Sequence, residues 1–586
     1  MTKRLFSLVL TVVLLLSCVS GALAEEVKLN TYKYWEPNWP LANGDVEVTI
    51  AASVNSSYYV DPAKNWFWTW AQQATGLKIN VIQITDEAVS ERRTLMFASD
   101  DLPDVLMGMG LTTGDLMRYG LQEGQLLDIT PYITSETMPY LTMWCEKYPM
   151  IRTIATTPDG KIYCLPYTNM NSDYIGSQET LFYNMEWLQE VHPEVGELPT
   201  TREAYEQWMA DTADVLPHTL DQFTELMYAF KANHPDSTPI AGLDSTNTPL
   251  GYLMHAFGFL GGNGYGYEAS LREGKVVMPA TDPVFFEYLK LVNQYYNDGI
   301  ISKDFFTADA MVNQSLVTSN NAAVFAGAPY GYLPESKDYH KWDALFPLTS
   351  EYNPTTQVKE SNRFAVGTIV LSSKTEHAEL LLNFLDFFYS DLGIYYPWCG
   401  PLNGSEDTLG MVEGFYYDLE KGAKVFPDVI NGTYENSIAY VEGMGLGMAN
   451  ICNRSHSITE PDKYTTMMET LQHVQGVADE DINRVKLAYE HGDNYARMGS
   501  EQRVLPYVVN GFPDIVYYDA DTQETIDEIT LLLNDYVESE VAKFITGVTP
   551  LTEANFQSFV DTCNTYGAQD LVDIWTEAYN NYLAAQ

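Results

Sequence analysis

The sequence lacks the motifs that mark the common hydrolases, kinases and dehydrogenases. It has no HExxH, no GxSxG, no P-loop and no GxGxxG at the end of a strand. Residues 262–266 (GNGYG) are rich in glycine, but no clear strand and helix frame them. The 79 acidic residues supply chance carboxylate pairs everywhere, so a secreted glycoside hydrolase stays open as an alternative. We expect no catalytic residue, no metal and no cofactor.

Aromatic side chains are the binding groups that this sequence has in surplus. Aromatics make up 13% of the chain, including 41 Tyr and 11 Trp. Their rings can stack on a sugar face or a peptide side chain. Trp398 is the best single candidate, because Pro397 and Pro401 stiffen the segment around it and limit the entropy lost on binding. Tyr58 and Tyr59 are further candidates, since they follow a predicted strand and precede a predicted helix.

Another aromatic run belongs to the core. Trp66, Phe67, Trp68 and Trp70 lie within a helix predicted from Asp61 to about residue 74. At helical spacing at least two of these rings must face the sheet, so we expect them to pack and not to bind.

Strand and helix patterns alternate along the first hundred residues, which is how a doubly wound α/β lobe begins. Strands are predicted at 46–54, 77–84 and 104–107, then at 161–166, 180–184, 322–326 and 364–371. Besides the first helix, helices are predicted at 90–99, 185–232, 284–298, 376–391 and from 523 to the end. A chain of 586 residues is too long for one core, so two or more lobes are expected.

Charge and the N-terminus limit the partners and the location. The net charge of −47 disfavours nucleic acid and anionic membranes. Lys3 and Arg4 precede an apolar run, and a small-x-small site ends at Ala24, which predicts a cleaved secretory signal peptide. A lipid anchor at Cys18 is the competing interpretation. Cleavage after Ala24 removes Cys18 and leaves five scattered cysteines, which we expect to be buried thiols without disulfide partners.

Several short stretches, in order and at the right spacing, resemble one family. They are 74–79 (ATGLKI), 98–105 (ASDDLPDV), 127–133 (LDITPYI), 159–166 (DGKIYCLP), 182–188 (FYNMEWL), 198–201 (LPTT), 298–306 (DGIISKDFF) and 544–547 (FITG). Together they resemble the large extracellular solute-binding proteins of ABC importers, the lipoprotein LplA-like group. Residues 403–515 show little likeness to it.

The resemblance implies the type II periplasmic-binding fold, in which two α/β lobes enclose a ligand between them and close on it. The implied division is a signal peptide at 1–24, a leader at 25–44, lobe 1 at 45–172 plus 364–395, and lobe 2 at 173–363 plus 396–586. The chain is expected to cross between the lobes near 167–180, 350–363 and 395–401. The implied partners are a small ligand and the permease subunits of an ABC importer, with the receptor as a monomer.

In such sheets, ligands meet loops at the carboxyl ends of strands. With Tyr58, Tyr59 and Trp398, that rule selects the following ligand-binding candidates: Met109, Tyr167, Asn169, Tyr330 and Tyr332. Arg363 is a further candidate, because it is one of few cations, precedes a predicted strand and could pair with an acidic group of a ligand. Stacking loops favour an oligosaccharide over a peptide. A surface module that only binds polysaccharide is the third alternative.

Some relatives in this family carry a calcium loop after a helix that ends in AFK. Here residues 229–239 read AFKANHPDSTP, without the alternating Asp/Asn ligands and the loop glycine. We therefore expect no calcium at 233–239.

Overall fold

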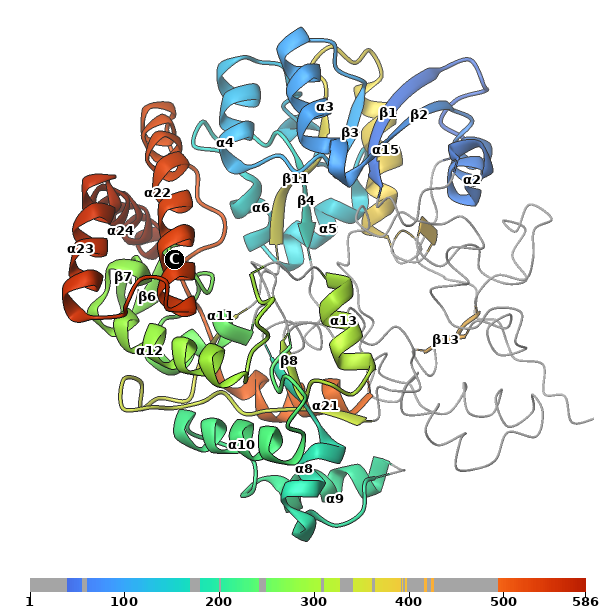
Figure 1. Ribbon diagram of the computed structural model, residues 1–586. Helices are drawn as coiled ribbons and strands as arrows, with labels where there is room; N and C mark the ends of the chain where they lie inside the picture. Colours follow the sequence, from blue (N-terminus) through green and yellow to red (C-terminus); the bar gives the residue numbers. More distant parts are fainter. Residues whose placement is uncertain are drawn as a thin grey trace, which may run out of the picture.

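The computed structural model describes most of both lobes (Figure 1). The described residues are 39–54, 61–168, 180–199, 202–241, 249–306, 310–326, 341–360, 364–390 and 494–585, with 393, 396–397, 416–418 and 423–425 between them. Tyr58, Tyr59, Asn169, Tyr330, Tyr332, Arg363 and Trp398 lie outside these ranges.

Lobe 1 is built on a five-stranded sheet in the order β2-β1-β3-β11-β4. The strands are β1 (Glu47–Val54), β2 (Lys78–Thr85), β3 (Val105–Met107), β4 (Leu165–Thr168) and β11 (Phe364–Leu371). β1 pairs in parallel with β2 and β3, whereas β11 runs antiparallel to both β3 and β4. This is the α/β lobe that the alternating pattern predicted.

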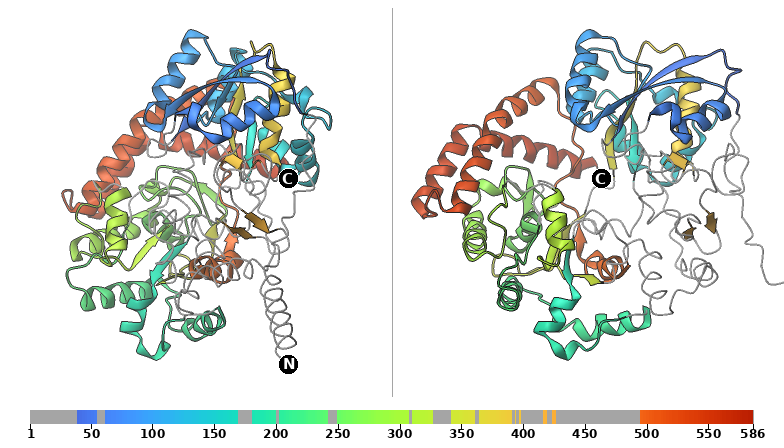
Figure 2. Two further views of the ribbon diagram at one scale, coloured as in Figure 1. Left: turned by 90° about the vertical axis from the view of Figure 1, so that its right-hand side faces the viewer. Right: turned by 45° about the vertical axis from the view of Figure 1, so that its right-hand side comes forward.

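Helices cover both faces of this sheet (Figures 1 and 2). They are α2 (Trp66–Thr75), α3 (Asp86–Ser99), α4 (Thr113–Asp115), the π-helical turn Leu116–Gln122, α5 (Pro139–Lys147), α6 (Met150–Ala155) and α15 (Ala378–Asp386). On one face Trp66, Phe67, Trp68 and Trp70 are all at most 2% exposed. The prediction that this run packs in the core is therefore confirmed.

The boundaries that differ from the sequence-based prediction include three in lobe 1. The helix after β1 begins at Trp66 and not at Asp61, because Asn65 caps it with its side chain and a separate 3₁₀ turn fills Pro62–Lys64. The strand at 161–166 begins only at Leu165. The helix at 376–391 ends at Asp386 and continues as a 3₁₀ turn, Phe387–Tyr389.

The end of the predicted leader packs onto lobe 1 and does not stand apart from it. The Trp39 indole N–H donates to Asn383 Oδ1 (3.1 Å), and its ring contacts Trp70 and Phe387. The backbone N–H of Leu41 donates to the carbonyl of Thr75 at the end of α2.

Lobe 2 holds a three-stranded sheet in the order β8-β5-β9, from β5 (Leu181–Asn184), β8 (Val324–Ala326) and β9 (Trp342–Ala344). Its helices are α8 (Met185–Val191), α9 (Arg202–Thr212), α10 (Leu220–Asn233), α11 (Pro249–Leu253), α12 (Pro283–Asp298), α13 (Ala310–Thr318) and α21 (Asn494–Arg503). One hairpin adds β6 (Ser270–Arg272) with β7 (Lys275–Val277). A separate two-stranded sheet pairs β12 (Tyr416–Asp418) with β13 (Ala423–Val425).

The C-terminal helices α22 (Ala520–Thr546), α23 (Glu553–Thr565) and α24 (Ala568–Ala585) complete lobe 2. Leu533, Val537 and Val541 of α22 lie in the same buried cluster as the β5 strand. Before them, β14 (Val508–Val509) runs parallel to β10 (Val358–Lys359). In the described part of the chain, no helix combines the length and the apolar run that a bilayer crossing requires.

Candidate functional site

The strand ends at which the chain passes to lobe 2 and returns from it lie at one edge of the lobe 1 sheet. β1, β2 and β3 are parallel, so Val54, Thr85 and Met107 end at this edge. β11 begins there, because Phe364 pairs with Thr168, the last residue of β4. The chain passes to lobe 2 after β4 and returns from it before β11, so this edge faces lobe 2 (Figure 1). It is the carboxyl edge where the sequence rule placed the ligand.

The loop after β3 approaches its neighbours closely at this edge. Gly108 has φ 68°, and a Cβ there would lie 2.2 Å from Ser53 Oγ on β1. Arg93 of α3 donates through Nη1 to the carbonyl oxygens of Met109 (3.1 Å) and Gly110. Arg93 also lies 3.8 Å from Asp115. This arginine, which fixes the loop at the edge, was not predicted, since an arginine on a helix carries no motif.

Two sequence-predicted candidates lie among the described residues. Tyr167 is in β4, half-buried and paired with the exposed Ala365 of β11, so it lies at the carboxyl edge. Met109 lies at the same edge, but its side chain is 0% exposed and packs in the buried cluster with Leu106 and Val370. In this arrangement the Met109 side chain therefore cannot contact a ligand, because it is packed in the apolar core beneath the sheet.

The segment that leads to Trp398 is anchored at the same end of lobe 1. Tyr396 is 1% exposed, and its ring contacts Trp66 (5.3 Å between centroids) and Trp70 (4.9 Å). Trp66 begins α2, which follows β1 at the carboxyl edge. Pro397 is also buried. The position of Trp398 itself stays a prediction.

The motif 98–105 serves the opposite edge of the sheet. Asp104 accepts from the backbone N–H of Thr49 (2.9 Å) and from the Thr375 hydroxyl (2.6 Å), so it ties the start of β1 to the turn after β11. Lys374 pairs with Asp100 at 2.7 Å. This family-like stretch is thus architectural, and its residues take no part in the carboxyl edge.

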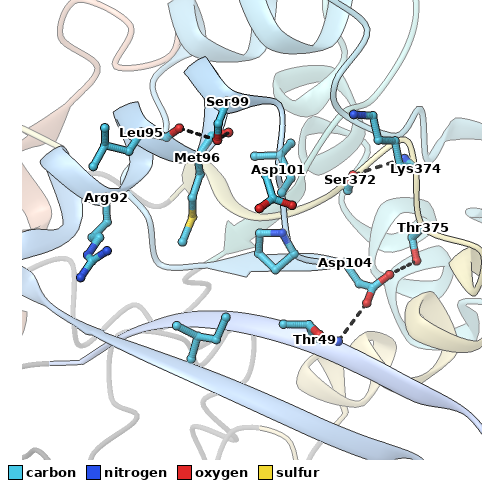
Figure 3. A pocket seen from close by; sticks show the side chains of 13 residues that line it. Thr49, Arg92, Leu95, Met96, Ser99, Asp101, Asp104, Ser372, Lys374 and Thr375 are labelled. Atoms are coloured by element: carbon cyan, nitrogen blue, oxygen red, sulfur yellow. Dashed lines mark hydrogen bonds between the residues drawn. The ribbon is translucent and has the colours of Figure 1, made fainter.

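A cavity of about 440 Å³ opens at that opposite edge (Figure 3). Arg92, Asp101, Asp104 and Lys374 supply its charges, and apolar side chains such as Leu95 line it together with serine and threonine residues. Its residues lie at the start of β1 and β3 and beyond the end of β11, away from the edge that faces lobe 2.

The loop at 233–239 is held by protein groups. Lys231 Nζ donates to the carbonyl of Ser237 (2.5 Å), and the Ser237 hydroxyl donates to the carbonyl of His234 (2.6 Å). The His234 ring stacks on Trp187 at 3.8 Å. The Lys231 ammonium group therefore already binds the Ser237 carbonyl oxygen that this loop would offer to a cation. Among the described residues, no group of three or more His, Cys, Asp or Glu could hold a metal ion.

Lobe 2 contains a buried ionic network that sequence analysis did not find. Asp343 on β9 is 0% exposed and pairs with Arg503 of α21. It also accepts from the hydroxyls of Tyr205 (2.6 Å) and Tyr183 (2.9 Å). Burial disfavours the charge of Arg503, but Asp343, Tyr183 and Tyr205 together outweigh it, and the pKa of Arg503 lies above its ordinary value. Arg503 also donates to Thr212 at 2.9 Å, so the network joins four elements of lobe 2: β5, α9, β9 and α21.

Three cysteines are described, and all three are free thiols. Burial raises the pKa of Cys145 to about 11, and that of Cys164 and Cys563 to about 12. Thiols in this state are poor nucleophiles at neutral pH.

The fold and the edge together define a class of protein. Two α/β lobes are connected by repeated crossings, and Tyr167 and Met109 lie at the edge where those crossings begin. This is the type II periplasmic-binding fold, in which a solute lies between the lobes.

The chain belongs to the family of bacterial extracellular solute-binding proteins, whose model matches residues 52–392. The fructooligosaccharide ABC transporter substrate-binding protein FusA of Streptococcus pneumoniae is 22% identical over 542 residues, which cover 89% of this chain and 88% of that protein. The family description places its members outside the cytoplasm.

Solved structures share the fold. FusA in complex with kestose has a TM-score of 0.67 at 20% identity, covering 92% of this chain and 100% of that one. A human-milk-oligosaccharide (HMO) binding protein associated with an ABC transporter of Bifidobacterium longum infantis has a TM-score of 0.65 at 16% identity, covering 92% and 99%. The alginate-binding protein AlgQ2, solved without calcium ion, has a TM-score of 0.65 at 17% identity, covering 93% and 100%. At these identities the likeness establishes the fold alone.

Proposed function

We propose that this protein is the oligosaccharide receptor of an ABC importer. The observation that carries the proposal is the carboxyl edge of lobe 1, where Tyr167 is partly exposed beside the crossings to lobe 2. The relatives named above bind fructooligosaccharide, milk oligosaccharide or alginate, which supports a carbohydrate over a peptide. The receptor captures the solute between its lobes and delivers it to the permease subunits.

Receptor action requires no chemistry on the solute. The family is a family of binding proteins, and we propose that this chain is not an enzyme. A signal peptide cleaved after Ala24, or a lipid anchor at Cys18, would keep the receptor outside the cytoplasmic membrane. The protein acts as a monomer, with one solute per chain.

Trp398 is proposed as the ligand-stacking side chain. Tyr396 is held in the aromatic cluster of lobe 1 at the carboxyl edge, and the buried Pro397 directly precedes Trp398 in the sequence, which supports this proposal. An indole stacked on a sugar face contributes roughly 1–3 kcal/mol. We expect Trp398→Ala to weaken binding by about one to two orders of magnitude.

The test begins with a thermal-shift screen of oligosaccharides and peptides, because a tight ligand raises the melting temperature by mass action. Calorimetry then gives the affinity of Trp398→Ala for the best ligand, with Trp68→Phe, a core residue of α2, as the matched control. Release of reducing sugar from the bound oligosaccharide would favour the glycoside hydrolase. Intact affinity with a much lower melting temperature would make Trp398 a core residue.

A further inference from the structure

The chain between β14 and α22 inserts consecutive residues into different lobes. Tyr517 packs against the lobe 1 cluster that contains Met109 and Cys164. Tyr518, the next residue, packs against the lobe 2 core together with Val508. Residues 510–519 form no helix or strand, so this irregular segment joins the two hydrophobic clusters directly.

Helix α22 extends this contact along both lobes (Figure 2). Its 27 residues make a rod about 40 Å long, at 1.5 Å per residue. Its second half lies in the lobe 2 core through Leu533 and Val537. Its first turn lies against α4 of lobe 1, where a Cβ on Gly114 would be 3.1 Å from Gln523 Cδ. Any change in the angle between the lobes must therefore break the contacts of Tyr517 and Gln523 or carry α22 with it.

The Tyr517 contact contains two opposing contributions. Burial of the ring against lobe 1 favours the present arrangement of the lobes. The hydroxyl is buried with no hydrogen-bond partner among the described residues, which disfavours that arrangement. Burial raises the pKa of the Tyr517 phenol, and the nearby Cys164 thiol raises it further, so the hydroxyl stays neutral.

We propose that Tyr517 is a positioning residue that sets the equilibrium between lobe arrangements, and through it the apparent affinity for solute. Because ring burial and the unpaired hydroxyl oppose each other, the Tyr517 contact can be broken at a low cost in free energy when a solute draws the lobes together. This inference rests on the proposed function, because it assumes that binding and lobe movement are coupled.

Two variants of Tyr517 shift the balance in opposite directions. Tyr517→Phe removes the unpaired hydroxyl and keeps the ring, so it holds the present arrangement more firmly. Tyr517→Ala removes the ring and releases it. The readout is the distance distribution between spin labels on unnatural amino acids at Glu91 in α3 and Glu225 in α10, both exposed, in the protein without solute. We expect a narrower distribution for Tyr517→Phe and a broader one for Tyr517→Ala.

Tyr518→Phe and Tyr518→Ala are the matched controls, because Tyr518 packs within lobe 2. They should lower the melting temperature without moving the distance distribution. If Tyr517→Phe leaves the distribution as in the wild type, or the Tyr518 variants move it equally, the proposal is wrong. Tyr517→Phe decides alone if Tyr517→Ala does not fold.

Affinity provides a second readout, with kestose as the probe. Apparent affinity scales with the fraction of molecules in the binding-competent arrangement, so the two Tyr517 variants should differ severalfold, on opposite sides of the wild type. The distances require no solute. A failure of every oligosaccharide to bind would overturn the proposed function, and the distances would still decide the role of Tyr517.

Discussion

The two lobes bury their large side chains in different ways. Lobe 1 packs rings on rings at the carboxyl edge, with Trp70 within 6.0 Å of Trp66, Phe387 and Tyr396. Lobe 2 buries the Asp343–Arg503 pair at its centre and surrounds it with tyrosine hydroxyls. Ring packing depends on area and shape, whereas a buried pair depends on every partner being present. The lobes should therefore differ sharply in their response to a single substitution.

The largest effect is expected from Arg503→Ala in lobe 2. It leaves the Asp343 carboxylate buried and without its cation, which should lower the free energy of unfolding by about 3–5 kcal/mol. Arg118→Ala breaks the exposed pair with Glu123 and should cost about 0–1 kcal/mol. Urea denaturation of both variants measures this. Similar small losses in the two variants would show that the network does not hold lobe 2 together.

Among the described residues of lobe 1, Asp386 is the one buried carboxyl group, and it should give that lobe a pH response. Asp386 accepts from the backbone N–H groups of Tyr140 (2.9 Å) and Leu141 (2.8 Å) at the start of α5. Burial raises its pKa to about 7, although these two hydrogen bonds lower it. The folded protein thus holds this proton between about pH 4 and 7, where the unfolded chain has lost it. The stability that Asp386 contributes is present below pH 4 and is lost as the pH rises through 7.

Asp386→Asn keeps the shape and cannot titrate. We expect its stability relative to the wild type to improve by a few kcal/mol from pH 4 to pH 8, measured by urea denaturation at both values. His255 of lobe 2 is the contrast, because burial lowers its pKa to about 4 and its stabilisation is lost as the pH falls from about 6.5 to 4. An unchanged difference between Asp386→Asn and wild type would mean that Asp386 is ionised throughout this range.

The smallest effect concerns the 233–239 loop of lobe 2. Lys231→Met removes the donor to the Ser237 carbonyl and should cost about 1 kcal/mol. Lys231→Arg, which can still donate, is the control. A chelator should leave the melting temperature of the wild type unchanged. A drop of many degrees that calcium reverses would overturn this prediction for the loop.

The contrast between ring packing in lobe 1 and the buried ion pair in lobe 2 also explains which features could be predicted from the sequence. Trp66, Phe67, Trp68 and Trp70 share one helix, so their spacing alone predicts that they pack. The strands of lobe 1 follow from short apolar runs. Asp343 and Arg503 are 160 residues apart, and each alone has the pattern of an ordinary surface charge. No local pattern can indicate such a pair, and the same holds for Tyr517, whose contacts lie in another lobe.

The site was predicted only in part. The carboxyl-edge rule selected Tyr167, which lies there, half-buried. It also selected Met109, because the rule locates a loop but not the direction of each side chain. Arg93 was missed, since its partners are backbone carbonyls that carry no sequence signal. The remaining candidates lie outside the described residues and stay predictions.

The central claim is that the two lobes close on an oligosaccharide at the carboxyl edge of lobe 1. Small-angle scattering of the protein with and without a saturating oligosaccharide, chosen from the thermal-shift screen, tests it most directly. We expect a smaller radius of gyration in the complex, because hinge closure brings the lobes together. Binding confirmed by calorimetry with an unchanged radius of gyration would contradict it.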